Sequence, residues 1–216
     1  MGLGLLSKEV KMNKQAKAVL DYWFSDFDID EKIDSESACV QRWFRRNMET
    51  DKEIKKLFEE DLKKAIKGEY DFWAEDAEGR LALTILLDQF PRNMYRNTTK
   101  AFSGDLKALE LALRSIKDGF DGRVEFVERL FIYMPLMHSE NLEVQELSLK
   151  YFTLLVEEAT ACEEINVDYL KTVLDYAQRH YDMIKEFGRF PHRNKVLRRR
   201  STSDELAFLQ MPNSSF

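Results

Sequence analysis

The segment RLALTILLDQFPRN, residues 80–93, predicts a central helix, because residues 81–87 are apolar on nearly every side of a helix. A surface helix has one apolar stripe, whereas a helix without a polar face lies at the centre of a core. We therefore predict that residues 81–87 belong to the most buried helix. Pro91 is expected to end or bend this helix at Phe90, because proline removes a helical hydrogen bond and clashes with the preceding turn.

Apolar residues at helical spacing continue on both sides of this segment. Capping boxes, glycines and prolines mark where these helices start and stop. We predict eight helices beside the central one. They cover residues 14–24, 35–48, from the capping box Thr50–Glu53 to near Gly68, 105–117 (stopped by Asp118-Gly119), 123–134 (stopped by Pro135), 141–159, 168–187 (stopped by Gly188), and a short final stretch after a second capping box, Thr202–Glu205. No segment alternates as a strand does. About nine helices with short connections predict an all-α fold of antiparallel helix pairs.

Composition narrows the class of protein further. The 216 residues include only eight glycines and four prolines, which argues against turn-rich all-β and collagen-like folds. A formal charge of −6 argues against a nucleic-acid partner, and the basic run Arg198–Arg200 is interpreted as a solvated face. We expect a single all-α domain over residues 1–216. Residues 1–13 are expected to form a loose N-terminal arm, and residues 201–216 a short C-terminal helix and tail.

The sequence also lacks the patterns that mark membrane spans, signal peptides and common metal sites. No run reaches the roughly 18 apolar residues of a membrane span, and the N-terminus lacks a signal-peptide pattern. Cys39 and Cys162 have no CxxC or zinc-type spacing, and there is no HExxH motif. We therefore expect a soluble cytoplasmic protein without membrane contact, and we assign it no metal and no cofactor.

Two segments that resemble each other suggest where a site could lie. DQFPRN (residues 88–93) and FGRFPHRN (residues 187–194) both contain Phe-Pro followed by Arg-Asn. Asp88 follows the most apolar helix, where an unpaired acid would be costly. Arginine grips carboxylates and phosphates with two parallel hydrogen bonds, and histidine moves protons near neutral pH when a carboxylate orients it.

These considerations predict a polar pocket for a small anionic ligand, formed by residues 88–93, 138–140 and 188–194. The arginines Arg92, Arg189 and Arg193 would outnumber the carboxylates Asp88 and Glu140 and give the pocket an excess of positive charge. The candidate acid–base groups are His138, His192, Asp88 and Glu140, and the candidate ligand-binding residues are Arg92, Asn93, Arg189, Arg193, Asn194 and His180.

Two alternatives remain open at the level of sequence. The same segments could be capped helix ends tied together by buried ion pairs, with His180 as a satisfied core residue. The protein would then be a scaffold for a protein or peptide partner, with a groove lined by other residues. The sequence names neither a reaction nor an oligomeric state.

The candidate residues fall within a longer set of motifs. The set comprises VLDYWF (19–24), WF (43–44), residues 81–93, AF (101–102), PLMHSE (135–140) with Gln145, residues 180–194, ST (201–202) and Glu205. In these motifs the sequence resembles the domain-of-unknown-function family 924, over roughly residues 19 to 210. The resemblance implies an all-α fold similar to tetratricopeptide-repeat proteins, and it implies no established activity.

The chain departs from this family at one turn. Where the family typically has Leu-Gly-Arg, this chain has Leu197-Arg198-Arg199. Because a residue with a side chain disfavours positive φ, we expect Arg198 to alter the turn or to exclude a positive φ there.

Overall fold

The computed structural model describes residues 12–212 and 214. Over this part of the chain there are nine α-helices and no β-strand, which confirms the predicted all-α fold. The α-helices are α1 (Lys14–Trp23), α2 (Ala38–Phe44), α3 (Met48–Ile66), α4 (Ala77–Met94), α5 (Asp105–Asp118), α6 (Phe126–Met137), α7 (Leu142–Ala161), α8 (Val167–Phe187) and α9 (Ser203–Phe208). Short 3-10 helices are η1 (Asp71–Glu75), η2 (Thr99–Phe102), η3 (Asp121–Arg123) and η4 (Pro191–Arg193).

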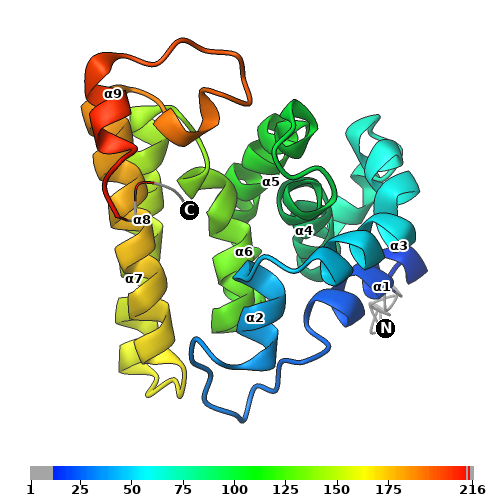
Figure 1. Cartoon of the computed structure of the whole chain (residues 1–216). Coiled ribbons are helices and arrows are strands. Elements are labelled where there is room, and N and C mark those ends of the chain that lie inside the picture. The colour runs from blue at the N-terminus through cyan, green and yellow to red at the C-terminus, as the bar shows by residue number, and fades with distance from the viewer. Residues whose placement is uncertain (1–11, 213, 215–216) are drawn as a thin grey trace, which may run out of the picture.

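Consecutive helices from α3 to α8 pack against one another in chain order. Figure 1 shows α7 and α8 side by side and joined at one end, as an antiparallel pair must be. The similarity of the whole array to tetratricopeptide repeats stays a prediction. Residues 1–11 of the expected N-terminal arm lie outside the described residues.

Helix α4 is the centre of the molecule. Helices α1, α3, α5 and α6 all pack against it, and Figure 1 shows it between α3 and α6. Each residue from Leu81 to Leu87 is 0% exposed, which confirms that this segment belongs to the most buried helix.

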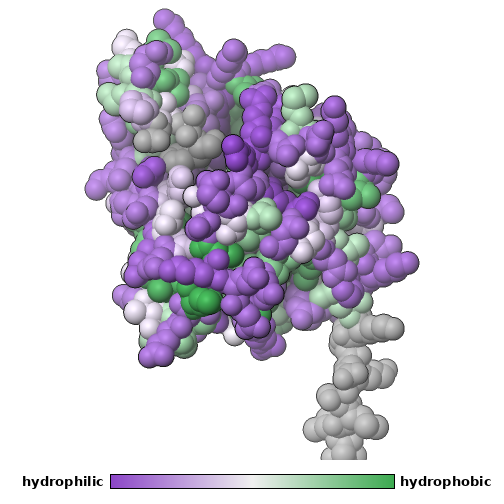
Figure 2. Space-filling model, turned by 60° about the horizontal axis from the view of Figure 1, so that its bottom comes forward, coloured by the Kyte–Doolittle hydropathy of each residue, from purple (hydrophilic) through white to green (hydrophobic). Residues whose placement is uncertain are grey.

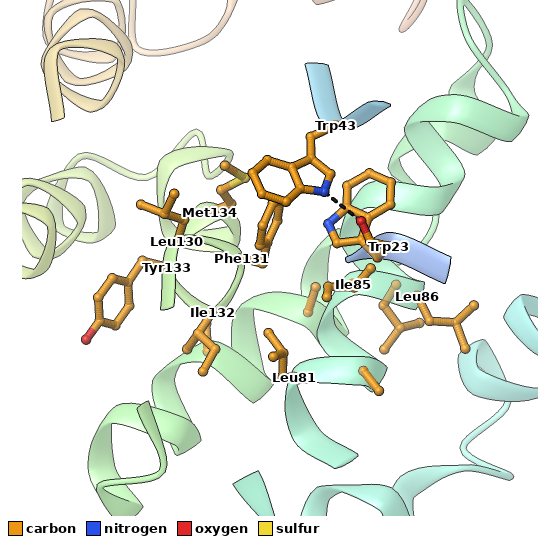
Figure 3. Close-up of a cluster of buried hydrophobic side chains, with 14 of the residues drawn as sticks. Trp23, Trp43, Leu81, Ile85, Leu86, Leu130, Phe131, Ile132, Tyr133 and Met134 are labelled. Carbon is orange, nitrogen blue, oxygen red and sulfur yellow. Dashed lines mark hydrogen bonds between the residues drawn. The ribbon is translucent and has the colours of Figure 1, made fainter. Parts of the chain in front are cut away.

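An aromatic cluster joins the first two helices to α6. The indole Nε1 of Trp43 donates a hydrogen bond of 2.8 Å to the backbone carbonyl of Trp23 (Figure 3). The ring of Phe131 lies with its centroid 5.1 Å from that of Trp43 and 5.6 Å from that of Trp23, both edge-to-face. Because these aromatic rings come from α1, α2 and α6, they fix three elements at one end of the apolar core.

The two interior prolines do not end their helices where the sequence predicted. Helix α4 continues through Pro91 to Met94, and α6 continues through Pro135 to Met137. In α4 the missing proline N–H leaves the carbonyl of Leu87 without its helical donor. The backbone of Gly104 packs against that carbonyl so closely that a Cβ there would lie 2.1 Å from its oxygen. A residue with a Cβ at position 104 would therefore have to move away from this carbonyl.

Three other predicted boundaries were wrong because side chains cap the backbone elsewhere. Helix α2 starts at Ala38 rather than at residue 35, since Asp34 and Ser37 form a local turn through their side chains. Helix α3 starts at Met48 rather than at Thr50, because the side chain of Asn47 accepts hydrogen bonds from the amides of Glu49 and Thr50. Helix α6 starts at Phe126, after a capping box that Glu125 forms with Glu128.

Other predicted stops are confirmed. Gly119 and Gly188 end α5 and α8 in the left-handed conformation, with φ of +64° and +67°. Thr202 and Glu205 form the predicted capping box of α9.

A second, smaller apolar cluster lies apart from the main core. Met183, Ile184 and Phe190 are buried together, with Phe187 and Phe208 packed against them. These residues come from the end of α8, from α9 and from the segment between them. We call that connecting segment, residues 188–202, the C-terminal strap.

Hydrophilic side chains predominate on the face of the described residues shown in Figure 2, and the hydrophobic residues visible there form separate small patches. Within the described residues, no helix combines the length and the apolar character required to cross a membrane.

We predict that Gly104→Ala lowers the free energy of unfolding by about 1–3 kcal/mol, the usual cost of overpacking a tight contact. The new methyl group would have to displace the Leu87 carbonyl, because the neighbouring atoms are backbone rather than flexible side chain. Urea denaturation of the two proteins measures the difference. Gly122→Ala is the matched control, since a Cβ at that position meets no atom of the described residues within 4 Å. Equal stability of the two variants would contradict the proposed Gly104 contact.

Candidate functional site

The last two turns of α4 carry three polar side chains that meet near the end of α6, namely Asp88, Gln89 and Arg92. Because the helix continues through Pro91, Asp88 and Arg92 lie one turn apart on the same face. Arg92 Nη1 lies 3.2 Å from Asp88 Oδ1, and the side-chain amide of Gln89 donates to Asp88 Oδ2. Asp88 is 0% exposed, so its carboxylate depends on these partners rather than on water.

His138 completes the environment of this carboxylate. It is the C-terminal capping residue of α6, and its Nδ1 lies 2.8 Å from Asp88 Oδ1. A carboxylate only accepts hydrogen bonds, so Nδ1 carries the proton and Nε2 is left as an acceptor in the neutral ring. The described residues provide no hydrogen bond to Nε2. Asp88 and His138 therefore form a dyad in which the acid orients the base.

The electrostatics of the dyad favour an ionised acid beside a neutral base. Burial alone would raise the pKa of Asp88, but the positive charge of Arg92 and the hydrogen bonds from His138 and Gln89 lower it to about 2. Burial and the nearby Arg92 lower the pKa of His138, and they outweigh the opposing effect of Asp88. His138 is consequently neutral at pH 7 and able to accept a proton at Nε2.

The C-terminal strap brings a second arginine to the dyad. Arg193 Nη1 donates a hydrogen bond of 3.1 Å to the backbone carbonyl of His138. Its guanidinium carbon lies 4.3 Å from the ring centroid of Phe190 and 4.9 Å from that of Phe102. Burial and the charge of Arg92 lower the pKa of Arg193 to about 10, which still leaves it charged at pH 7.

Asp105 is the member of the cluster that sequence reasoning missed. It begins α5, and its carboxylate lies 2.9 Å from Arg92 Nη1 and 3.9 Å from Arg193 Nη1. The only sequence signal was an acid at a predicted helix start, which ordinarily indicates a favourable helix-dipole interaction. Two arginines therefore face two carboxylates, and the predicted excess of positive charge is wrong. We call Asp88, Arg92, Asp105, His138 and Arg193 the charged cluster.

The other two histidines lie beside this cluster. His180 Nδ1 donates to the carbonyl of Tyr176 at 2.8 Å, and its ring centroid lies 6.2 Å from that of His138. The ring of His192 lies 5.5 Å from that of Phe190. Burial lowers the pKa of His180 to about 3 and that of His192 to about 4, with nearby positive charge contributing to both. Both rings are neutral at pH 7.

Glu140 lies outside the charged cluster and binds the strap through Phe190 and Arg199. Its carboxylate accepts hydrogen bonds from Arg199 at 2.6 and 2.8 Å and from the backbone amide of Phe190 at 2.8 Å. Burial would raise the pKa of Glu140, but the bonds from Arg199 and from the Phe190 amide lower it. The carboxylate of Glu140 therefore binds residues of the strap rather than the Asp88–His138 dyad.

Arg189 and Asn194 likewise hold the strap to α9. Arg189 forms two hydrogen bonds with the buried carboxylate of Glu205, at 2.6 and 2.8 Å. Asn194 donates to Ser201 and Glu205 and accepts from Arg199. The hydrogen bond from Arg189 lowers the pKa of Glu205 to about 2.

Asn93 takes part in a third network, on the opposite side of the same helical turn. Its side-chain amide donates to Asp51 at 2.9 Å, and Asp51 also pairs with Arg96. The structure thus gathers four of the ten candidates in one cluster, namely Asp88, Arg92, His138 and Arg193. Two more, His180 and His192, lie beside that cluster. The remaining four make their contacts elsewhere, namely Asn93, Glu140, Arg189 and Asn194. No group of three or more His, Cys, Asp or Glu residues in the described part of the chain is placed to hold a metal ion.

Arg198 keeps the backbone conformation that glycine would favour. Its φ is +55°, so the expectation that an arginine excludes positive φ is wrong. The amide of Arg199 donates to the carbonyl of Asn194 at 2.8 Å across this turn. The turn therefore places Arg199 beside Glu140. Arg198 adopts the left-handed conformation to form this turn, which is unfavourable for a residue with a Cβ.

The fold and this cluster define an all-α protein in which the end of a central helix meets a C-terminal strap around a buried acid–histidine pair. The chain matches the family model described as "Bacterial protein of unknown function (DUF924)" over residues 19–213, and it belongs to that family. This confirms the resemblance seen in the sequence motifs.

A solved structure of a protein of unknown function, ATU0120 from Agrobacterium tumefaciens, is similar to this chain. The TM-score is 0.73 at 30% sequence identity, and the match covers 90% of this chain and 96% of that one. No curated protein matches the chain.

We predict that Arg198→Gly raises the free energy of unfolding by about 0.5–1 kcal/mol, because glycine adopts positive φ without steric cost. Urea denaturation provides the comparison. Arg198→Ala is the control, since it removes the charge but keeps a Cβ in the left-handed conformation. If the alanine variant gains as much stability as the glycine variant, strain at this φ is not the cause.

Proposed function

We propose that the charged cluster binds a small carboxylate ligand beside His138. This proposal rests on hydrogen-bonding atoms of the cluster that have no hydrogen-bond partner among the described residues. His138 Nε2 has no hydrogen bond from the described residues, and Arg92 Nη2 and Arg193 Nε are buried without an acceptor among them. Buried donors without acceptors are rare and costly, so such atoms point to a ligand or an ordered water.

The balance of charge favours a singly charged ligand. Asp88 and Asp105 already offset the two guanidinium groups, so a multiply charged anion would find no excess positive charge. A carboxylate suits this environment because its two oxygens match planar N–H donors.

The orientation of His138 favours a ligand that also carries an O–H group. With its proton fixed on Nδ1 by Asp88, the ring can only accept at Nε2 while it is neutral. A hydroxycarboxylate offers a hydroxyl donor to Nε2 and a carboxylate to the arginines. His138 would then hold, or receive, the hydroxyl proton of the ligand, and Asp88 would stabilise the resulting positive ring.

Thermal denaturation with acetate, glycolate and oxalate tests this proposal, since ligands that bind the native state raise Tm. We expect glycolate to raise Tm more than acetate, by about 2–4 °C for each kcal/mol of added stabilisation. His138→Asn keeps a donor toward Asp88 but removes Nε2, so the difference between glycolate and acetate should disappear. Arg193→Gln should abolish the shifts with both ligands.

Arg189→Gln is the matched control, because that arginine pairs with Glu205 outside the cluster. Its response to glycolate should equal that of the unchanged protein once each is compared with its own ligand-free Tm. Absence of any shift in the unchanged protein, or equal shifts in Arg193→Gln, would contradict the proposal. The cluster would then be structural, and binding of a protein or peptide partner to the helical scaffold would become the better hypothesis.

A further inference from the structure

A concave site lies at the connection between α2 and α3, away from the charged cluster. A hollow of about 420 Å³ opens there, and its walls include Arg42, Arg45, Arg46, Asn47 and Thr50. None of the residues of the charged cluster lines it. Its size falls within the range of small-molecule sites, which is about 300–1,000 Å³.

One of the three arginines is neutralised by the single acid in the lining. Arg42 contacts Asp26 Oδ2 through Nε and through Nη2, each at 2.7 Å. Its guanidinium carbon also lies 5.0 Å from the ring centroid of Tyr22, which holds the side chain in place. Arg42 therefore forms a fixed wall and contributes no net charge together with Asp26.

The other two arginines keep their positive charge. Arg45 Nη1 donates to the neutral side-chain oxygen of Gln41 at 2.7 Å. Arg46 forms no ion pair with any residue in the described part of the chain, and both side chains are exposed. The lining thus carries two uncompensated positive charges, although the whole chain has a formal charge of −6.

The nearby acids do not cancel this charge within the hollow. Asp51, on the first turn of α3, is paired with Arg96 at 2.6 Å. Glu49, on the same turn, is not part of the lining. The first amides of α3 are occupied by the side chain of Asn47, so the arginines rather than the helix end supply the donors.

We propose that this hollow binds the phosphate group of a small phosphorylated molecule through Arg45 and Arg46. Two guanidinium groups on adjacent residues match the double charge of a phosphate at neutral pH, and each offers several N–H donors to its oxygens. Thr50, which also lines the hollow, provides a neutral hydroxyl donor beside them. This site takes a more highly charged ligand than the balanced cluster around His138.

Isothermal titration calorimetry with inorganic pyrophosphate tests the proposal. The double variant Arg45→Ala/Arg46→Ala should bind pyrophosphate at least about tenfold more weakly than the unchanged protein, the effect of losing about 1.4 kcal/mol of binding free energy. Asp26→Asn should bind it more tightly, because the single acid of the lining has been neutralised. The matched control is Arg123→Ala/Arg179→Ala, which removes the same charge from exposed positions outside the hollow.

His138→Asn separates this site from the one proposed around the dyad. Pyrophosphate binding should be unchanged in that variant, whether or not glycolate binds at the charged cluster. The proposal is overturned if the unchanged protein does not bind pyrophosphate, or if the two double variants lose the same affinity. It is also overturned if His138→Asn, rather than Arg45→Ala/Arg46→Ala, removes binding.

Discussion

The ionised carboxylate of Asp88 is buried near the end of the central helix and has to find its partners within the protein. A charge in that position is tolerated only when it is paired and hydrogen-bonded on all sides, and breaking such a pair costs about 3–5 kcal/mol. Its partners are Gln89 and Arg92 on α4 and His138 at the end of α6. The need to satisfy one carboxylate therefore holds the ends of two helices together.

The same constraint extends outward through the arginines. Arg92 reaches from Asp88 to Asp105 at the start of α5, and Arg193 reaches from Asp105 to the carbonyl of His138. Because Arg193 belongs to the C-terminal strap, the strap must be held in place before the cluster is complete. Glu140 with Arg199 and Arg189 with Glu205 provide that attachment, and the small apolar cluster around Phe190 supports it.

The sequence predicted those features that depend on local chemistry. The burial of residues 81–87 follows from the absence of a polar face, and the stops at Gly119 and Gly188 follow from the left-handed conformation that glycine permits. The need of Asp88 for a partner follows from its position after an apolar helix. What the sequence could not show depends on neighbours distant in the chain. Gly104 packs against the carbonyl that Pro91 leaves without its helical donor, and Asp105 joins the cluster through tertiary packing alone.

Asp88 fixes the proton of His138 on Nδ1, while burial and the charge of Arg92 keep the ring neutral. Nuclear magnetic resonance of ¹⁵N-labelled histidine reports the tautomer and the pKa of each ring, and His→Asn variants assign the three signals. We predict that His138 at pH 7 is neutral with the proton on Nδ1, and that its pKa lies below the ordinary value of 6.5. Since the folded ring resists protonation, the native state should lose stability relative to the unfolded chain as the pH falls below 6.5. A His138 ring that is positively charged at pH 7, or that carries its proton on Nε2, would contradict this arrangement of Asp88 and His138.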